Sequence, residues 1–398
     1  MQMSIARGAH VVLLGLLIGT LSSTGSTVAQ SSTGMVLGWN ATTLKTITAS
    51  LLGLTADFSQ TAQGADSGEL WVTSQGTDRL FIVHGQGSSI ETIPVPGIGP
   101  HITTFSPLGD YAYVSGMRNG DLSILRADDR QVVQTLHLGP TLTHQAKPSP
   151  DGSVLLVAQI ASMTLIKVAA DEAAESWQVV GSLSFASLGR APICSVFRDD
   201  GERAYVSLRP SGIAIVDVPT MTHIGTFATD GFVACGLIKS KRGRIVTVAS
   251  SGSGGHIYRL DTTADTLSDA GTLGAADWHS FNMSPNEKVG FGTSPGSDEI
   301  ILADLTGPMA SPIAALPLDP TPGIANDQPD ALSVRGNTLF VSLRASGQLA
   351  IVKVNQQTAR FLQLSPPAPF NPATCGPPPP EPPNGQGGCA IHGVTVRP

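Results

Sequence analysis

Three histidines share one place in a repeated pattern, and their side chains could do acid–base or metal chemistry. His101, His144 and His279 each lie twelve residues before the second residue of a short strand-like segment, AYVS, LLVA or GFGT. An imidazole titrates close to neutral pH, so it can transfer protons, and its ring nitrogens bind transition metals. The three histidines are therefore candidate catalytic residues and a candidate site for a divalent transition metal.

The segments that position these histidines recur seven times. Their second residues fall at 71, 113, 156, 205, 247, 291 and 340, spaced by 42, 43, 49, 42, 44 and 49 residues. Turns such as SPLGD and SPDGS precede most copies, and alternating strands such as SGIAIVDV follow. Four short strands in a unit of about 40–45 residues are typical of a propeller blade. The sequence predicts an all-β, seven-bladed β-propeller with four-stranded antiparallel blades over residues 54–365.

The innermost strands of a propeller surround its central channel, so the position of the three histidines should form a ring. Its seven predicted occupants are Ser59, His101, His144, Ile193, Cys235, His279 and Gln328. Three uses of this ring are compatible with the sequence. It could be a hydrated channel without chemistry, a metal site with three imidazoles and one open position, or a general acid–base site.

Two arginines follow the repeated segments and could hold an anionic substrate against the histidines. Arg209 in YVSLRPSG and Arg344 in FVSLRASG each lie four residues after the second residue of their segment. We expect both in turns near a mouth of the channel or on the rim.

The repeated units resemble the YVTN-type propeller repeat in their SPDG turns, their AYVS segments and strands such as SGIAIVDV. A second, partial resemblance is to the lactonase and carboxymuconate-cyclase propellers. It is carried by HQAKPSPDGSVLLVAQ, which starts at His144, and by GRAPICSVFRDDGERAYV at 189–206. This resemblance implies that His144 transfers a proton and that Arg190 binds a carboxylate. The family has a glutamate where this chain has Arg209.

The two ends of the chain differ in composition from the repeats. Arg7, the apolar run VVLLGLLIG and the cleavage site in TVAQ predict a secretory signal peptide over residues 1–29. Residues 30–53 form a lead-in whose segment 41–53 could close the ring as an outer strand, a role for which 359–365 competes. Residues 366–398 are predicted to be a Pro/Gly-rich tail.

The charge and hydropathy of the chain limit the classes of partner that it is expected to bind. The net charge is −7, and KSKRGR at 239–244 is the only basic cluster, so nucleic acid is not an expected partner. After the leader, no segment has the roughly 20 apolar residues that a membrane span needs. We therefore expect a secreted, extracellular monomer with a small-molecule or saccharide ligand.

Four cysteines in an oxidising compartment predict two disulfides, with three possible pairings. Cys375 and Cys389 lie in the same tail and could bond to each other, which would leave Cys194 to pair with Cys235. Asn40 begins the sequon NAT, so the sequence also predicts a glycoprotein.

Two functions are compatible with these features. The leading hypothesis is a secreted enzyme that acts on an acidic or lactone-like small molecule or an acidic sugar, by lyase, cyclase or lactonase chemistry. His144 and His101 would be the acid and base, and the substrate would be oriented by His279 and by Arg190, Arg209 or Arg344. The alternative is a non-catalytic extracellular or cell-surface binding propeller whose channel is only hydrated.

Overall fold

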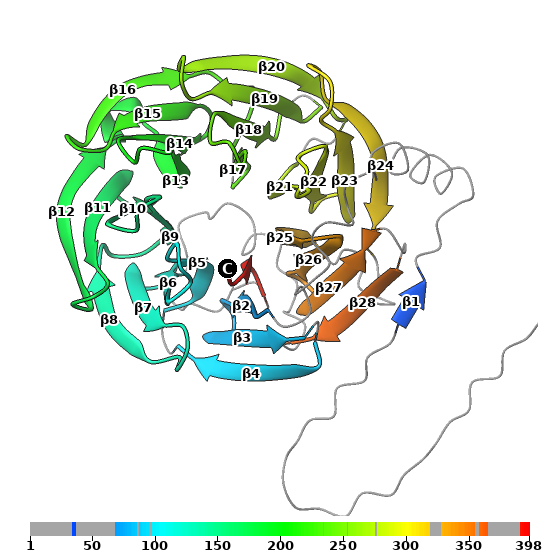
Figure 1. Ribbon diagram of the computed structural model, residues 1–398, viewed down its shortest axis with the longest axis horizontal. Coiled ribbons are helices and arrows are strands. Elements are labelled where there is room, and N and C mark those ends of the chain that lie inside the picture. The colour runs from blue at the N-terminus through cyan, green and yellow to red at the C-terminus, as the bar shows by residue number, and fades with distance from the viewer. Residues whose placement is uncertain are drawn as a thin grey trace, which may run out of the picture. The chain divides into compact units, whose positions relative to one another are not determined.

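The computed structural model describes residues 34–36 and 68–398, apart from 86, 96–97, 234, 253, 275–276, 319–327, 355–357 and 365–390. Within the unit formed by residues 32–398, seven antiparallel sheets are arranged around one axis as the blades of a β-propeller (Figure 1). The predicted all-β class and the seven four-stranded blades are confirmed. The predicted signal peptide, Asn40, the segment 41–53, Ser59, Cys375 and Cys389 lie outside the described residues.

In each blade the four strands lie side by side, in order from the innermost strand at the channel to the outermost. Blades 1 and 2 contain β29 (Val394–Val396), β2 (Leu70–Ser74), β3 (Arg79–His84) and β4 (Ser89–Pro94), then β5 (Pro100–Phe105), β6 (Tyr111–Gly116), β7 (Asp121–Arg126) and β8 (Val132–His137). Blades 3 and 4 contain β9 (Thr143–Pro148), β10 (Val154–Gln159), β11 (Thr164–Asp171) and β12 (Ser176–Ser184), then β13 (Ala191–Phe197), β14 (Arg203–Arg209), β15 (Ile213–Asp217) and β16 (Thr222–Phe227).

Blades 5 and 6 contain β17 (Leu237–Lys239), β18 (Ile245–Ser250), β19 (His256–Asp261) and β20 (Thr266–Thr272), then β21 (Phe281–Met283), β22 (Val289–Ser294), β23 (Glu299–Asp304) and β24 (Ser311–Pro317). Blade 7 contains β25 (Pro329–Arg335), β26 (Thr338–Leu343), β27 (Gln348–Lys353) and β28 (Thr358–Gln363), and β1 (Gly34–Val36) pairs with the outer edge of β28. A short 3-10 helix, Ala186–Leu188, lies between blades 3 and 4. No helix in the described part of the chain is long and apolar enough to cross a membrane.

The hydrophobic core lies between neighbouring blades rather than in the channel. The second strand of a blade has apolar neighbours on both faces, so β6, β22 and β26 are buried along their whole length. The outermost strand faces solvent on one side, and β16 accordingly alternates between exposed and half-buried residues. Between blades 1 and 2, Trp71 packs edge-on against Phe105, with ring centroids 5.3 Å apart.

Blade 6 replaces the usual branched residue of the repeated segment with glycine. In GFGT, Gly292 stands where other blades have valine, and a Cβ atom at this position would lie 1.8 Å from the indole of Trp278. Trp278 is buried against Phe281 in the adjoining core. The absence of a side chain at Gly292 therefore makes room for the tryptophan.

The strand β29 closes the ring. It pairs antiparallel with β2, with Leu70 opposite Val396 and Val72 opposite Val394. In Figure 1 it is the red strand beside β2 at the inner edge of blade 1. The sequence predicts only a tail here, because three alternating residues after a long Pro-rich run are too weak a strand signal. Residues 391–398 instead belong to blade 1.

Candidate metal centre in the inner ring

In blades 1, 2, 6 and 7, a hydroxyl at the same place in the repeat bonds to the inner strand of the next blade. The side chain of Thr73 donates a hydrogen bond of 2.6 Å to the carbonyl of His101, and Ser115 donates likewise to His144 at 2.6 Å. Thr293 donates to the carbonyl of Asp330, and Ser342 donates to that of His392. These hydroxyls are the last residues of the repeated AYVS-like segments. The bonds identify equivalent positions in successive blades.

The inner ring defined by these equivalent positions differs from the predicted ring at two of seven places. Its members are His392, His101, His144, Ile193, Cys235, His279 and Asp330. Ser59 was expected in blade 1, but the inner strand of that blade is β29, which contributes His392. In blade 7, Asp330 takes the place expected for Gln328.

The displacement in blade 7 has a local cause. Tyr113 of blade 2 pairs with Thr104, nine residues earlier, whereas Phe340 of blade 7 pairs with Ser333, only seven residues earlier. The hairpin between β25 and β26 turns in two residues, Gly336-Asn337, instead of through a longer turn of the SPDG type. Counting back twelve residues from Phe340 therefore gives Gln328, two residues before the ring member Asp330.

Three side chains from blades 6, 7 and 1 converge within the inner ring. The Nδ1 atom of His279 lies 2.5 Å from one carboxylate oxygen of Asp330, and the Nδ1 atom of His392 approaches the other oxygen. One ligand atom from each of the three residues lies within 4.8 Å of the other two. Asp330 is completely buried and His392 is 6% exposed, whereas the side chain of His279 is 30% exposed. The cluster is thus buried at Asp330 and His392 and is exposed to solvent only through the side chain of His279.

The contacts of this cluster are short and buried. His279 and His392 each place Nδ1 against one oxygen of the Asp330 carboxylate, and all four atoms are buried. Hydrogen bonding with His279 is among the causes that lower the pKa of the Asp330 carboxyl. A divalent cation that displaces the shared protons could bind the same nitrogen and oxygen lone pairs. Two imidazoles and one carboxylate suit a divalent transition metal and leave coordination positions open.

Charge states in the ring favour ligation. Burial lowers the pKa of His392, although the Asp330 carboxylate opposes the shift. For Asp330, burial acts to raise the pKa, but the charges of His279, His392 and Arg344 outweigh burial and hold it well below its usual range. The Nη1 atom of Arg344 lies 3.7 Å from a carboxylate oxygen of Asp330. The ring therefore presents a carboxylate and a neutral imidazole, the forms in which these groups bind metals.

His101 and His144 lie beside the cluster. The ring of His101 stacks on that of His392 at 3.7 Å between centroids, and the ring of His144 meets His101 edge-on at 4.5 Å. Burial, together with repulsion from His392 and His144, holds the pKa of His101 well below its usual value. Burial, assisted by His392 and His279, lowers the pKa of His144 to about 3. Both imidazoles are neutral at neutral pH.

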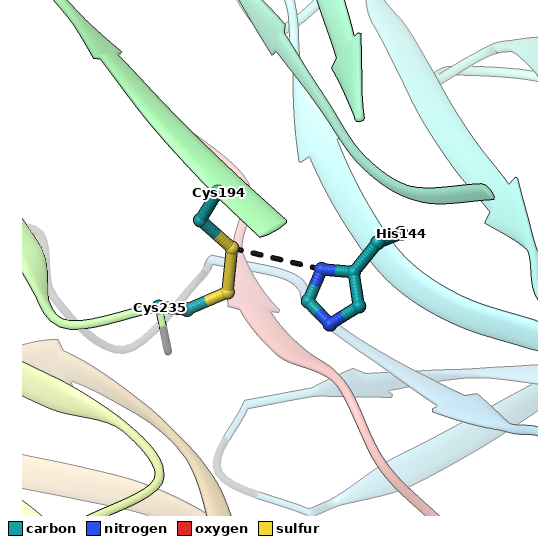
Figure 2. A group of neighbouring side chains, drawn as sticks. All are labelled: His144, Cys194 and Cys235. Atoms are coloured by element: carbon teal, nitrogen blue, oxygen red, sulfur yellow. Dashed lines mark hydrogen bonds between the residues drawn. A yellow bond between two sulfur atoms is a disulfide. The ribbon is translucent and has the colours of Figure 1, made fainter. Parts of the chain in front are cut away.

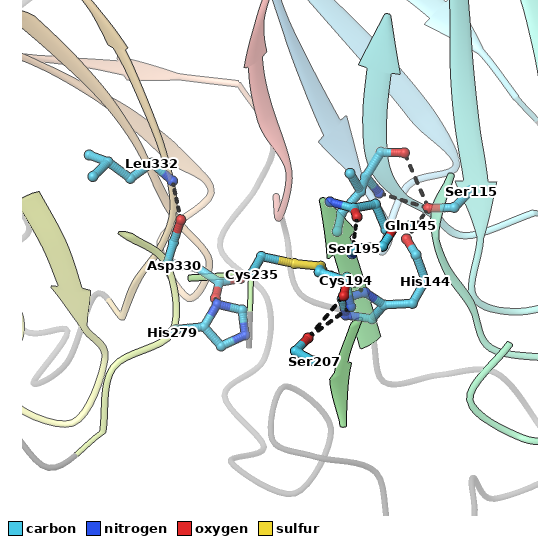
Figure 3. Close-up of a disulfide and its surroundings, with 12 residues drawn as sticks. Ser115, His144, Gln145, Cys194, Ser195, Ser207, Cys235, His279, Asp330 and Leu332 are labelled. Carbon is cyan, nitrogen blue, oxygen red and sulfur yellow. Dashed lines mark hydrogen bonds and ion pairs between the residues drawn. A yellow bond between two sulfur atoms is a disulfide. The ribbon is translucent and has the colours of Figure 1, made fainter. Parts of the chain in front are cut away.

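Cys194 and Cys235 form a disulfide within the ring, as the sequence predicts, with Cα atoms 5.4 Å apart. It joins β13 of blade 4 to the first residues of blade 5. The Nδ1 atom of His144 points at Cys194, 3.7 Å from its Sγ atom (Figure 2). Figure 3 shows the disulfide between His144 on one side and His279 with Asp330 on the other.

The three candidate arginines lie at different places. Arg344 is close to the cluster, where its Nε donates to the amide oxygen of Gln328 at 2.8 Å. Arg209 pairs with Ala191 at the channel end of blade 4, and its guanidinium lies 5.1 Å from the ring centroid of Phe232. Arg190 precedes this strand pair and donates to the carbonyl of Ser211 at 2.6 Å. The structure brings Arg344 into the site and places the other two at the edge of blade 4.

Sequence reasoning missed His392 and Asp330. The segment HGVTV at 392–396 has the alternation of a short strand, but nothing local assigns it to blade 1. Asp330 would have been found from Gly336-Asn337, since a Gly/Asn pair between two strand-like segments predicts a two-residue hairpin.

No family model matches the chain, and no curated protein matches it. The resemblances to YVTN repeats and to lactonase propellers therefore remain sequence-based expectations. Among solved structures, the chain is similar to Kuenenia stuttgartiensis hydrazine synthase, at 17% identity and TM-score 0.53, over 66% of this chain and 79% of that one. It is similar to the dihydro-heme d1 dehydrogenase NirN at 15% identity and TM-score 0.53, over 74% of this chain and 73% of that one. It is also similar to the Myceliophteria thermophila Cps50 (Swd1) β-propeller domain at 11% identity and TM-score 0.54, over 74% of this chain and 96% of that one. At these identities the likeness shows a β-propeller fold alone.

Proposed function

We propose that the inner ring is the active site of a metal-dependent enzyme that hydrolyses or rearranges a small lactone-like or acidic substrate. The observation that carries this proposal is the convergence of His279, Asp330 and His392, whose ligand atoms lie within 4.8 Å of one another and are buried. A divalent transition metal is the cofactor that such a ligand set fits. The leader predicted over residues 1–29 would place this enzyme outside the cell.

The three ligands would come from blades 6, 7 and 1, with His101 and His144 of blades 2 and 3 beside them. A metal held by three protein ligands binds a water molecule or a substrate oxygen and makes that water more acidic. His279 provides the solvent-exposed edge through which both would enter. Asp330 is held in place by Arg344, which therefore acts as a positioning residue for this ligand.

We assign His101 as the acceptor of the proton of the attacking water, with its basicity lowered by burial, which holds its pKa well below the usual value. Its Nδ1 lies 3.3 Å from the amide oxygen of Gln75, and with that oxygen as acceptor Nδ1 would carry the ring proton. Its Nε2 is buried and has no hydrogen-bond partner among the described residues. The lone pair of Nε2 is thus available as a general base.

For a lactone substrate, the proposed reaction balances with water alone. The water oxygen bonds to the carbonyl carbon while its proton passes to Nε2 of His101. The ring C–O bond then breaks, and the proton moves from His101 to the departing oxygen, which gives a hydroxy acid. A divalent ion held by His279, Asp330 and His392 would supply positive charge to stabilise the negative charge that develops on the carbonyl oxygen.

Metal content is the first test. Protein freed of metal with a chelator and titrated separately with Zn²⁺, Mn²⁺ and Fe²⁺ should bind one equivalent of at least one of them by calorimetry. Asp330→Asn and His392→Gln should each weaken this binding by about tenfold or more, because a direct ligand contributes at least as much as an outer-shell partner. His137→Gln is the matched control, since His137 lies on β8 with its side chain 72% exposed. Absence of binding in the folded wild type would reject the proposed metal centre.

Turnover is the second test. Hydrolysis of a lactone releases a carboxylic acid, so a panel of aliphatic and sugar lactones can be screened by proton release. We expect hydrolysis that requires the bound metal, and His101→Gln should lower kcat while leaving metal affinity close to that of the wild type. Bound metal with no turnover on lactones or acidic sugars would instead support the non-catalytic binding propeller.

A further inference from the structure

A second set of metal-binding side chains lies on the other side of the inner ring, in blades 3, 4 and 5. His144, Cys194 and Cys235 each place one ligand atom within 4.8 Å of the other two. We propose that a thiol reductant converts this group into a second metal site with two thiolates and one imidazole. The site shares no ligand with the His279–Asp330–His392 cluster, so it does not rest on the function proposed above.

The position of the histidine supports this proposal. In a tetrahedral zinc site, Zn–S is about 2.3 Å and Zn–N about 2.0–2.1 Å, which puts a sulfur and a nitrogen about 3.6 Å apart. The observed separation between Cys194 Sγ and His144 Nδ1 is 3.7 Å (Figure 2). One edge of the coordination polyhedron is thus already present. The His144 side chain also has a hydrogen bond with the backbone of Ile193, the residue next to Cys194, which holds the imidazole beside the sulfur.

Reduction supplies the missing ligands. Two molecules of a thiol reduce the disulfide to two cysteine thiols and form one reductant disulfide, which is a two-electron exchange. Each thiol then loses its proton to solvent as the ion binds. While the sulfur atoms are bonded to each other they are too close to act as two ligands of one ion. After reduction, rotation of the two side chains separates them without a change in the backbone.

The backbone holds the three ligands ready for an ion. His144 lies in β9 and Cys194 in β13, Cys235 lies two residues before β17, and the Cα atoms of the two cysteines are only 5.4 Å apart. Cys194 is 2% exposed, whereas Cys235 is half-buried, so a small thiol can approach the bond from blade 5. Two thiolates and one imidazole leave one position open and select a soft or borderline ion, Zn²⁺ or Cu⁺.

Cobalt is a suitable probe because thiolate ligation of Co²⁺ produces charge-transfer absorption that nitrogen and oxygen ligands do not. The full chain should carry Cys375→Ser and Cys389→Ser, so that only the ring cysteines can provide thiolates. After reduction with a phosphine and removal of excess reductant, Co²⁺ should bind with this absorption at one ion per chain. The same protein left oxidised should not show it.

Three variants in that background locate the ligands. Cys194→Ser combined with Cys235→Ser should abolish the thiolate absorption, and His144→Ala should weaken Co²⁺ binding by about tenfold or more. His279→Ala is the matched control, because it removes a ring histidine of the other cluster and should leave the absorption unchanged. A reduced, folded protein without thiolate absorption would overturn the proposal. Unchanged affinity in His144→Ala would remove the histidine from the site.

A thermal measurement covers the case in which reduction weakens the fold. A metal that binds only the folded, reduced protein must raise its Tm in proportion to the logarithm of its concentration. Zn²⁺ should therefore raise the Tm of the reduced protein by more than it raises the Tm of the Cys194→Ser, Cys235→Ser variant, which keeps only the His279–Asp330–His392 cluster. An equal shift in both proteins, or none in either, would count against the site.

Discussion

The burial of Ile391 provides a direct test of how the ring is closed. This side chain is fully buried and immediately precedes His392, in a cluster with Leu70 and Val72 of β2 and with Phe340 of blade 7. It therefore packs where the last blade meets the first. If β29 is the strand that closes the propeller, Ile391→Ala should destabilise the whole domain.

The size of the effect follows from the atoms removed. Replacing isoleucine with alanine deletes three buried carbon atoms, worth about 2.4 kcal/mol at roughly 0.8 kcal/mol each. The cavity left behind adds to this, so the free energy of unfolding should fall by about 2–5 kcal/mol. Val132→Ala on the outer strand β8, where the side chain is 52% exposed, is the matched control and should change it by less than about 0.5 kcal/mol.

Urea unfolding followed by tryptophan fluorescence is a suitable assay, because Trp71 is fully buried and pairs with Thr395 of β29. Ile391→Ala should lower the urea midpoint with an unchanged slope. Deletion of residues 391–398 should go further and remove one metal ligand together with the strand. A midpoint for Ile391→Ala within error of that for Val132→Ala would show that β29 does not stabilise the folded ring in solution.

Three further predictions concern stability. Replacing both Cys194 and Cys235 with alanine should lower the free energy of unfolding by about 4 kcal/mol, the loop-closure value for a sequence separation of 41, as measured by urea titration without reductant. Gly292→Ala should destabilise by about 1–3 kcal/mol, because its Cβ would overlap a buried indole, whereas Gly225→Ala on β16 meets no atom within 4 Å and should be neutral in the same assay. Hydrogen bonds, first from Ser149 and then from Ser153, lower the pKa of Asp151, so its contribution to stability is complete above the unfolded-state pKa and is lost as pH falls through the folded-state pKa. Urea midpoints measured on acidification should therefore fall less steeply in Asp151→Asn than in the wild type.

The fold could be predicted because each blade repeats the same local rules. The second strand is apolar on both faces. In blades 1, 2, 6 and 7, the Ser or Thr of its repeated segment donates a hydrogen bond to the neighbouring blade. Ser115 and Thr293 both bond to the carbonyl of the next ring residue, which explains why a hydroxyl recurs at that place. These signals are local in sequence, so seven copies reinforce one another.

The candidate site was only partly predictable, because its decisive residues depend on what differs between blades. His101, His144 and His279 follow the regular spacing and were found. Asp330 precedes a shorter hairpin, so counting back twelve residues from Phe340 reaches Gln328 instead. His392 takes its place through pairing between strands about 320 residues apart in sequence, since its neighbour Gly393 bonds to Thr73. No local pattern encodes a contact at that range.

The pairing of β29 with β2 also determines the order in which the chain can be completed. During synthesis β2 emerges first, and its inner edge stays unpaired while the other six blades are made. His392 arrives only after every other ring residue has been synthesised. An ion that needs His279, Asp330 and His392 therefore cannot nucleate folding, as zinc does in small metal-bound domains. Such an ion would complete its ligand set only after His392 has been synthesised.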